Sequence, residues 1–250
     1  MKRLIIAFTF LFGTALWGAT VVEEKTFDPK GLQEVSVENI NGDITVIVTP
    51  GSALRLKATK EADTESHLKS IEVKTSTSGG TLLIQTEHAR SYIFGFIPLK
   101  TGGHVDYRLE VPPELRLTLD TVNGDIKVSG PAKRVNATTV NGDLDAEAYA
   151  GDVHLESVNG SIKLTLKDAL PRISLETVNG SVSVVVPDDL DAKYSFETVS
   201  GDIRFIPEKF KVKGSGPKNV EGLFGSGKGQ LSAETVNGTI TIRFKGPTAV

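Results

Sequence analysis

The sequence contains no cysteine and has only one methionine and one tryptophan among its 250 residues. Without cysteine, the chain has no disulfide bond, thiolate metal ligand, cysteine nucleophile or lipidated cysteine anchor. The methionine and the tryptophan, Met1 and Trp17, both lie within the first nineteen residues. The stability of the remaining chain must therefore come from side-chain packing and backbone hydrogen bonds.

The chain also lacks a strong excess of charge and, beyond its N-terminus, a long apolar stretch. A formal net charge of -3 with scattered lysines leaves no basic face, so no nucleic-acid partner is expected. No apolar stretch after residue 19 approaches the roughly 20 residues that span a bilayer, so we expect no transmembrane segment in the mature chain. A hydrophobic share of 39% is nevertheless enough for a buried core.

The first nineteen residues have the order that is typical of a secretory signal peptide. Two basic residues precede an apolar stretch, which ends in small residues. We expect cleavage after Ala19, although Trp17 is bulky for its place before the cut and Gly13 with Ala15 offers an alternative. The protein is therefore predicted to be exported and to be periplasmic, cell-surface or secreted, with residues 20–250 forming a single domain.

A five-residue phrase of the type TVNGD recurs along most of the chain. It stands at residues 121–125 and returns with small changes five times further on, and Gly42 belongs to the same series. From Gly124 onward, the central glycines are 18, 18, 20, 21 and 37 residues apart. Repetition at a nearly constant period indicates a repeat architecture. The central glycines are Gly42, Gly124, Gly142, Gly160, Gly180, Gly201 and Gly238.

Apolar residues recur at every second position on both sides of each central glycine, which predicts two strands per copy. Counted from the central glycine, the apolar residues stand at odd positions in the upstream strand and at even positions in the downstream strand. The alternation must therefore slip by one residue at Thr-Val-Asn-Gly. Such a slip requires a bulge or corner, where glycine can adopt the positive φ that a bend often demands. The residues of these predicted structural corners are Asn123, Gly124, Asn141, Gly142, Asn159, Gly160, Asn179, Gly180, Gly201, Asn237 and Gly238.

This pattern predicts an all-β fold, a parallel β-solenoid of about seven TVNG-type coils. Hairpins around each Asn-Gly would not explain why whole units of 18 to 21 residues recur in phase, whereas stacking each unit on the last does. Residues 50–113 interrupt the period, and we expect an irregular, strand-rich section with a short helix that continues the same core. The glycine-rich stretch before the last copy is expected to be a long loop or a degenerate coil.

These repeat columns, the export signal, the strand-rich section and the glycine-rich loop together resemble the bacterial putative-adhesin family of β-strand-repeat domains of unknown function. The resemblance covers about residues 35–244. It implies a right-handed β-helix-like domain in a secreted or envelope protein. The family supplies no catalytic residues to carry over.

An acidic column lies four residues before the repeat glycines. In stacked strands about 4.8 Å apart these side chains would form a stripe, in which like charges repel. We interpret the stripe as a solvated face with lysine partners, and a weak cation or ligand stripe is the alternative. Two stacked carboxyl groups also imitate a retaining glycosidase pair, although any repeated acid in a parallel coil gives that spacing. The candidate residues are Glu156, Glu176, Glu197 and Glu234.

Three further motifs suggest chemistry only weakly. The residue after each repeat glycine is Asp, Ser or Thr, which suits a turn cap better than a calcium ligand. The stretch GLFGSGKG at residues 222–229 resembles a phosphate-binding loop, but Gly229 stands where Ser or Thr should bind magnesium. Of the scattered histidines only His88 and His104 could meet, and a zinc site would need further ligands. We therefore expect no cofactor, no metal site and no catalytic residue.

The most apolar irregular stretch of the mature chain lies around Tyr92, Phe94 and Phe96. We favour a plug over one end of the solenoid, whose terminal coil would otherwise expose its core and a strand edge. The alternative is a docking patch for a protein partner or a membrane surface.

The sequence thus predicts a non-enzymatic, exported envelope or surface protein that acts as a β-solenoid scaffold or an adhesin-like binding surface. Its partner would be an unknown protein or polysaccharide at the cell envelope. One alternative is a carbohydrate-active β-helix enzyme that uses a pair from Glu156, Glu176 and Glu197, and another is a cation-dependent adhesin that uses the acidic stripe. The lack of tryptophan for sugar stacking counts against the enzyme.

Overall fold

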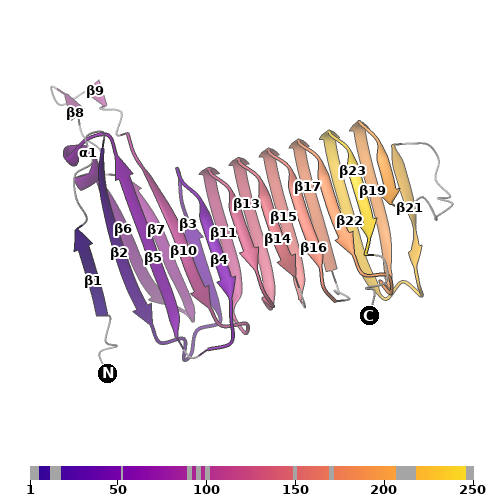
Figure 1. Cartoon of the computed structure of the whole chain (residues 1–250), viewed down its shortest axis with the longest axis horizontal. Helices are drawn as coiled ribbons and strands as arrows, with labels where there is room; N and C mark the ends of the chain where they lie inside the picture. The colour runs from indigo at the N-terminus through magenta and orange to yellow at the C-terminus, as the bar shows by residue number, and fades with distance from the viewer. Residues whose placement is uncertain are drawn as a thin grey trace.

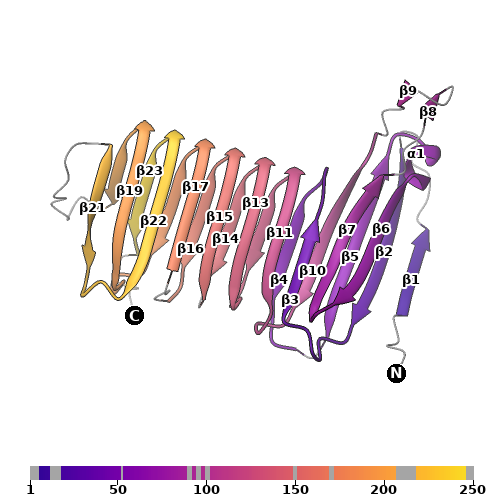
Figure 2. The same ribbon diagram turned by 180° about the vertical axis from the view of Figure 1, so that it is seen from behind.

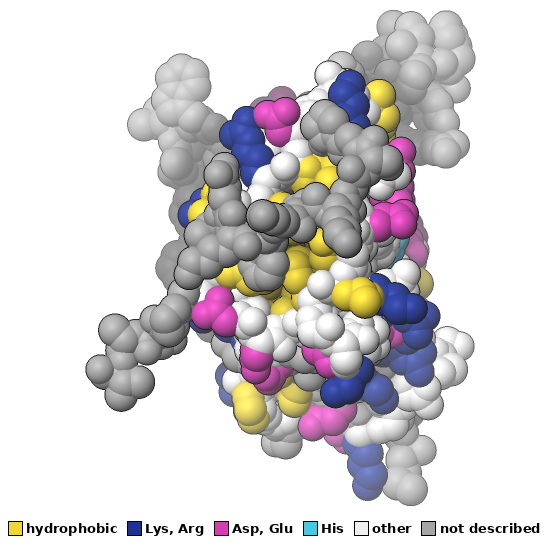
Figure 3. Space-filling view, turned by 90° about the vertical axis from the view of Figure 1, so that its right-hand side faces the viewer, with side chains coloured by type: hydrophobic (Ala, Val, Ile, Leu, Met, Phe, Trp, Pro, Cys, Tyr) yellow, Lys and Arg dark blue, Asp and Glu magenta, His cyan; other side chains and the backbone are white. Residues whose placement is uncertain are grey.

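The computed structural model describes residues 6–11, 18–51, 53–88, 92–93, 97–98, 102–148, 151–168, 172–206 and 218–245. Most of these residues belong to two long β-sheets that run side by side along the molecule (Figures 1 and 2). One cluster of buried hydrophobic residues extends between the sheets, from Phe27 to Ile242. Seen from the end that carries β21 (Asn219–Phe224), hydrophobic side chains lie centrally and charged side chains around them (Figure 3). The all-β prediction is confirmed.

The ten-stranded sheet is antiparallel at both ends and the eleven-stranded sheet only at its β1 end, and both sheets are parallel through the repeats. The eleven-stranded sheet contains, in spatial order, β1 (Ile6–Leu11), β2 (Ala19–Phe27), β5 (Leu54–Ala62), β10 (His104–Val111), β4 (Ile44–Val48), β12 (Ile126–Ser129), β14 (Leu144–Ala148), β16 (Ile162–Leu166), β18 (Val182–Val186), β23 (Ile240–Phe244) and β20 (Ile203–Ile206). The ten-stranded sheet contains β21, β19 (Ala192–Ser200), β22 (Gly229–Asn237), β17 (Arg172–Asn179), β15 (Asp152–Asn159), β13 (Arg134–Asn141), β11 (Arg116–Asn123), β3 (Glu34–Glu38), β7 (Thr81–His88) and β6 (Ile71–Ser78). The remaining elements are the helix α1 (Glu65–Lys69) and the pair β8 (Tyr92–Ile93) and β9 (Ile97–Pro98).

Each repeat unit contributes one strand to each sheet, and the TVNG phrase joins the two strands. The unit around Gly124, for example, supplies β11 to the ten-stranded sheet and β12 to the eleven-stranded sheet. Neighbouring units pair in register, so that Leu119, Ala137 and Leu155 lie opposite one another in the core. The predicted slip in burial therefore occurs at the corner between the two sheets.

The units do not stack in chain order at the end that carries β21. Strands β22 and β23 of the last unit insert between the Gly180 unit and the Gly201 unit. The expectation that each unit stacks on the last is therefore wrong for this pair. The Gly201 unit suits the terminal place because its large aromatic side chains pack with one another and with a residue of β21, which closes the core. These aromatic residues are Tyr194, Phe196, Phe205 and Phe224.

The section that interrupts the repeat extends both sheets at the opposite end. Strand β10 lies beside β4, with β5 beyond it, and β7 lies beside β3, with β6 beyond it. Their inward residues, such as Leu56 and Ile84, belong to the same core cluster as the repeats. The short helix α1 begins after Thr64, whose hydroxyl accepts a hydrogen bond from the backbone N–H of His67 at 3.1 Å. The described residues of this section thus add strands to the same core.

The corners are held by two sets of hydrogen bonds between neighbouring units. The Thr or Ser three residues before the glycine is buried, and its hydroxyl donates to the carbonyl oxygen of the neighbouring unit's corner glycine, as Thr139 does to Gly124 at 3.0 Å. The asparagine side chains donate to one another in a ladder, as Asn141 does to Asn123 at 2.8 Å. Both sets satisfy polar groups at the point where the chain leaves one sheet for the other.

The corner glycines are required for a reason other than the one expected. Most of them, including Gly142, do not adopt the left-handed φ that we predicted. A Cβ atom on Gly142 would instead overlap the backbone carbonyl oxygen of Gly124 in the neighbouring unit. Close stacking of backbone on backbone, rather than the conformation of the glycine itself, therefore excludes a side chain at these corners.

Replacing Gly142 by alanine is expected to destabilise the protein by about 2–4 kcal/mol, because the added methyl group meets rigid backbone and forces two units apart. Urea unfolding followed by circular dichroism measures the change. Gly51→Ala is the matched control, since its methyl group would meet no atom within 4 Å. Equal losses of stability in the two variants would contradict the stacking explanation.

Candidate functional surface on the ten-stranded sheet

In-register parallel strands arrange equivalent side chains in rows on the outward face of the ten-stranded sheet. Because neighbouring strands lie about 4.8 Å apart, equivalent positions on adjacent strands recur at that spacing. We name three rows. The glutamate row is Glu156, Glu176, Glu234 and Glu197; the valine row is Val158, Val178, Val236 and Val199; and the arginine row is Arg116, Arg134 and Arg172.

The glutamate row contains all four residues predicted as an acidic stripe, in a spatial order that the sequence did not indicate. Glu176 lies opposite Glu156 on one side and Glu234 on the other, and Glu197 lies beyond Glu234. Glu176 and Glu197 are therefore not neighbours, because the last unit inserts between theirs. All four side chains are exposed.

The row's polar partners in the structure are not the lysines that we expected. The Ser174 hydroxyl donates to Glu176 at 3.0 Å, and His154 Nε2 lies 3.8 Å from a Glu156 carboxylate oxygen. Further along the same column, Asp120 is partly buried, and this burial raises its pKa. The hydrogen bond from the Thr138 hydroxyl lowers the pKa of Asp120, whereas the negative charge of Glu38 raises it further. The side chains of this column are thus acidic but differ in their exposure to water.

The valine row is an aliphatic stripe on the outside of the protein. Its exposed fractions range from 38% at Val158 to 57% at Val199, and Ile40, Val122 and Val140 continue it toward the N-terminal section. Together with the glutamate row it lines a shallow groove of about 240 Å³. An apolar stripe beside an acidic row is unusual for a merely solvated face.

The arginine row was missed by the sequence analysis. It lies eight residues before the corner glycines, near the start of β11, β13 and β17, and it borders a hollow of about 450 Å³. The signal was present in the repeat alignment as three arginines at one position. It is easily overlooked because Glu34 and Asp152 occupy the same position in other units.

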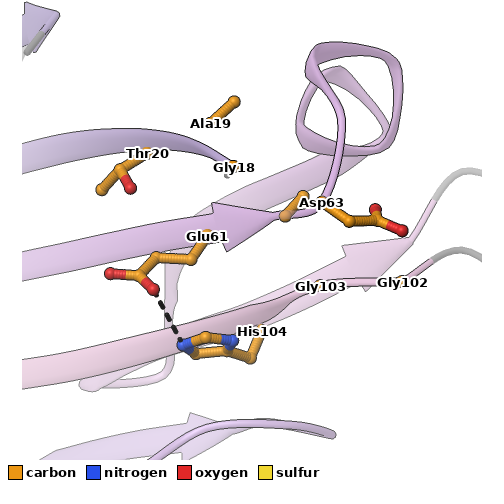
Figure 4. A pocket seen from close by; sticks show the side chains of 9 residues that line it. Gly18, Ala19, Thr20, Glu61, Asp63, Gly102, Gly103 and His104 are labelled. Atoms are coloured by element: carbon orange, nitrogen blue, oxygen red, sulfur yellow. Dashed lines mark ion pairs between the residues drawn. The ribbon is translucent and has the colours of Figure 1, made fainter. Parts of the chain in front are cut away.

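A second hollow lies away from these rows, at the ends of β5 and β10. Its volume is about 510 Å³, and it is lined by Thr20, Glu61, Asp63 and His104 among others. His104 Nε2 points toward Glu61 at 3.6 Å from a carboxylate oxygen, whereas the Asp63 carboxylate points away (Figure 4). The separation is longer than a hydrogen bond and is typical of a surface ion pair. His88, the expected partner of His104, belongs to β7 in the other sheet.

Of the apolar stretch around Tyr92, the structure describes only β8 and β9, which form a separate two-stranded sheet. Tyr92 belongs to β8, which pairs with β9 and stands near α1 beyond the strand ends (Figure 1). Phe94 and Phe96 lie outside the described residues, so the plug and the docking patch stay predictions. Within the described part of the chain, no helix could cross a membrane, and no cluster of three His, Cys, Asp or Glu side chains could hold a metal.

The loop that resembles a phosphate-binding motif encloses a carboxylate of the protein itself. Asp191 accepts hydrogen bonds from the Ser226 hydroxyl at 2.8 Å and from the backbone N–H groups of Gly227 and Lys228 at 2.6 and 3.2 Å. The Lys228 ammonium lies 3.4 Å from the same carboxylate. These contacts, above all the one from Ser226, hold the pKa of Asp191 well below its usual range. The loop is therefore a clamp between β19 and β22.

Replacing Asp191 by asparagine is expected to lower the melting temperature by a few degrees at pH 7, because the loop loses its anion. Since the pKa of Asp191 is lower in the folded than in the unfolded chain, its contribution is present above about pH 4 and is lost as the pH falls further. Thermal unfolding at pH 7 and at pH 2.5 should therefore show a difference between the two proteins that shrinks in acid.

The control is Asp188→Asn, which removes an exposed carboxylate in the preceding turn that makes no such contacts with the described residues. It should leave the melting temperature unchanged at both pH values. A deficit of the Asp191 variant that is independent of pH would argue against the carboxylate clamp.

Comparison with solved structures finds matches that cover most of this chain. A putative cell adhesion protein from Clostridium sporogenes ATCC 15579 has a TM-score of 0.52 and 12% sequence identity, covering 90% of this chain and 99% of that one. A putative adhesin from Bacteroides fragilis NCTC 9343 has a TM-score of 0.34 and 9% identity over 98% of both chains. A putative lipid binding protein from Parabacteroides distasonis ATCC 8503 has a TM-score of 0.31 and 12% identity, covering 90% of this chain and 96% of that one.

At these levels of identity, the first of these structures supports the fold and says nothing about the ligand. Comparison with curated proteins finds no match. A family model, Toastrack DUF4097, matches residues 29–243, which include every repeat unit and the strand-rich section. The chain therefore belongs to the Toastrack DUF4097 family.

Proposed function

We propose that the protein is a non-enzymatic, exported envelope or surface protein that binds its partner along the outward face of the ten-stranded sheet. The observation that carries this proposal is the repetition of side-chain rows across neighbouring strands of that face. Rows of exposed groups suit a long or repetitive partner, whereas a small substrate is normally held in a concave pocket. The proposed role of this face is therefore that of an adhesin-like surface, which contacts a partner along its length.

The scaffold that we propose is a parallel β-solenoid of about seven TVNG-type coils. Each unit gives one strand to each sheet and turns at its TVNG corner, and the units pair in parallel with like residues on like residues. Both features support a coil as the repeating element. The right-handed β-helix form is the one that the family resemblance implies.

Export is proposed from the first nineteen residues. The segment supplies β1, which lies at the edge of the eleven-stranded sheet and pairs with β2. Removing this segment would leave the pairing of β2 with β5 in place. The fold shared with a protein described as a putative cell adhesion protein is compatible with a surface location.

The two alternative functions have less support. Glu156 and Glu176 lie opposite each other, but the glutamates of the row are exposed in equivalent places, whereas the two carboxyl groups of a glycosidase need different environments. For a cation-dependent adhesin, the described residues contain no group of three suitable ligands. We therefore propose a surface without a catalytic centre or a structural metal.

The absence of cysteine allows each face to be blocked selectively. We would introduce one cysteine at Glu176, on the ten-stranded sheet, or at Lys163, on the eleven-stranded sheet, and attach a polyethylene glycol chain through a maleimide. The purified proteins are then sedimented with cell envelopes of the host. Blocking at Glu176 should lower binding about tenfold or more, because the attached polyethylene glycol would cover all three rows.

Blocking at Lys163 is the matched control, since this residue is also exposed in the middle of a strand. It should leave binding within about twofold of the unmodified protein. Equal loss in both proteins, or no binding to envelopes by the unmodified protein, would contradict the proposed function.

A further inference from the structure

We propose that the arginine row is a binding site for an acidic polysaccharide, a linear sugar polymer that carries carboxylate groups. The inference rests on the proposed function, because it assigns a ligand class to one part of the same outward face. It is carried by the shape, the charges and the polar lining of the hollow beside the row.

The hollow crosses the strands rather than following one of them. Its volume of about 450 Å³ is lined by residues of β3, β11, β13, β15 and β17, which lie next to one another in the ten-stranded sheet (Figure 2). Four strand spacings of about 4.8 Å give it a length of about 19 Å. A ligand in this hollow meets equivalent positions at each strand, which suits a polymer whose own units recur at a comparable distance.

Two of the three guanidinium groups are available to a ligand. Arg134 donates to Asp152 at 2.8 Å, so its charge is partly neutralised. Among the described residues, Arg116 and Arg172 form no ion pair, and both are exposed. They stand three strand spacings apart, about 14 Å, on either side of the Arg134–Asp152 pair. Guanidinium groups bind carboxylates through paired, directional hydrogen bonds.

Polar side chains fill the row next to these arginines. Thr118, Asn136, His154 and Ser174 lie opposite one another on successive strands and line the hollow. The Thr118 hydroxyl is already donated to Glu34 and that of Ser174 to Glu176, whereas Asn136 and His154 lie between them. An amide and an imidazole suit the hydroxyl groups of a sugar, which both donate and accept hydrogen bonds.

The same features disfavour a nucleic acid as the ligand. Glu34 and Asp152 share the hollow with the three arginines, so its positive charge is low, whereas a phosphate backbone requires dense positive charge. Single strands also need aromatic side chains on which bases stack, and the lining residues include no Phe, Tyr or Trp. Carboxylates that alternate with hydroxyl groups along a sugar polymer fit the sparse arginines better.

Electrophoresis in native gels that contain polygalacturonate tests the proposal with the purified full-length protein. A bound protein is retarded, and the dependence of mobility on polymer concentration gives the affinity. The double variant Arg116→Gln/Arg172→Gln should bind about tenfold more weakly, because it loses the two available guanidinium groups. Gels with dextran, a neutral polymer, should retard neither protein.

The matched control is Lys127→Gln/Arg243→Gln, which removes the same charge from exposed positions on the eleven-stranded sheet. It should be retarded like the wild type, and circular dichroism should show all three proteins to be folded. Equal weakening in both double variants would overturn the site, since only net charge would then matter. Retardation by duplex DNA instead of polygalacturonate would overturn the ligand class.

Failure of this proposal can be told apart from failure of the proposed function. If polygalacturonate retards no form of the protein while the envelope binding remains sensitive to blocking at Glu176, the outward face binds a different partner and only the ligand class is wrong. If the Glu176-blocked protein still binds envelopes normally, the proposed function itself fails.

Discussion

The close stacking of glycine on glycine at the corners is the constraint on which the rest of the structure depends. Because a Cβ at Gly124 or Gly142 would overlap the backbone of the neighbouring unit, two units can approach only with their corners in register. The buried hydroxyls and the asparagine ladder then fix that register by hydrogen bonds, as between Thr139 and Gly124. With the strands in this register, leucine lies beside alanine in the core and glutamate lies beside glutamate on the outer face of the sheet. Core and surface rows are two consequences of one geometric condition.

Much of the fold could be predicted from the sequence because the information is local. Alternating burial identified both strands of each unit, and the shared corner phrase placed the turn between the sheets. The spatial order of the last two units was not predicted, because the regular repeat favoured stacking in chain order. The aromatic residues Tyr194, Phe196 and Phe205 were the available signal, since bulky side chains suit an end where no further unit must stack.

The candidate surface was predictable only in part. The glutamate row was found because its residues recur at one repeat position, but the exposure of the valine row was not, because apolar residues beside a corner resemble core. The contact between Asp191 and the loop at residues 226–228 was hidden for a different reason. It joins the beginnings of β19 and β22, and its partners lie 35 to 37 residues apart in the sequence.

On a surface built from repeats, one part differs from another only at positions where a unit departs from the repeated residue. A uniform arginine row would attract any polyanion with little discrimination, whereas Asp152 occupies one place in the row and partly neutralises Arg134. What remains is a pair of separated guanidinium groups at Arg116 and Arg172, with the Arg134–Asp152 ion pair between them. Their separation favours ligands whose charges have a matching period. The identical corners thus supply the scaffold, and the departures at the same repeat positions would supply the specificity of the face.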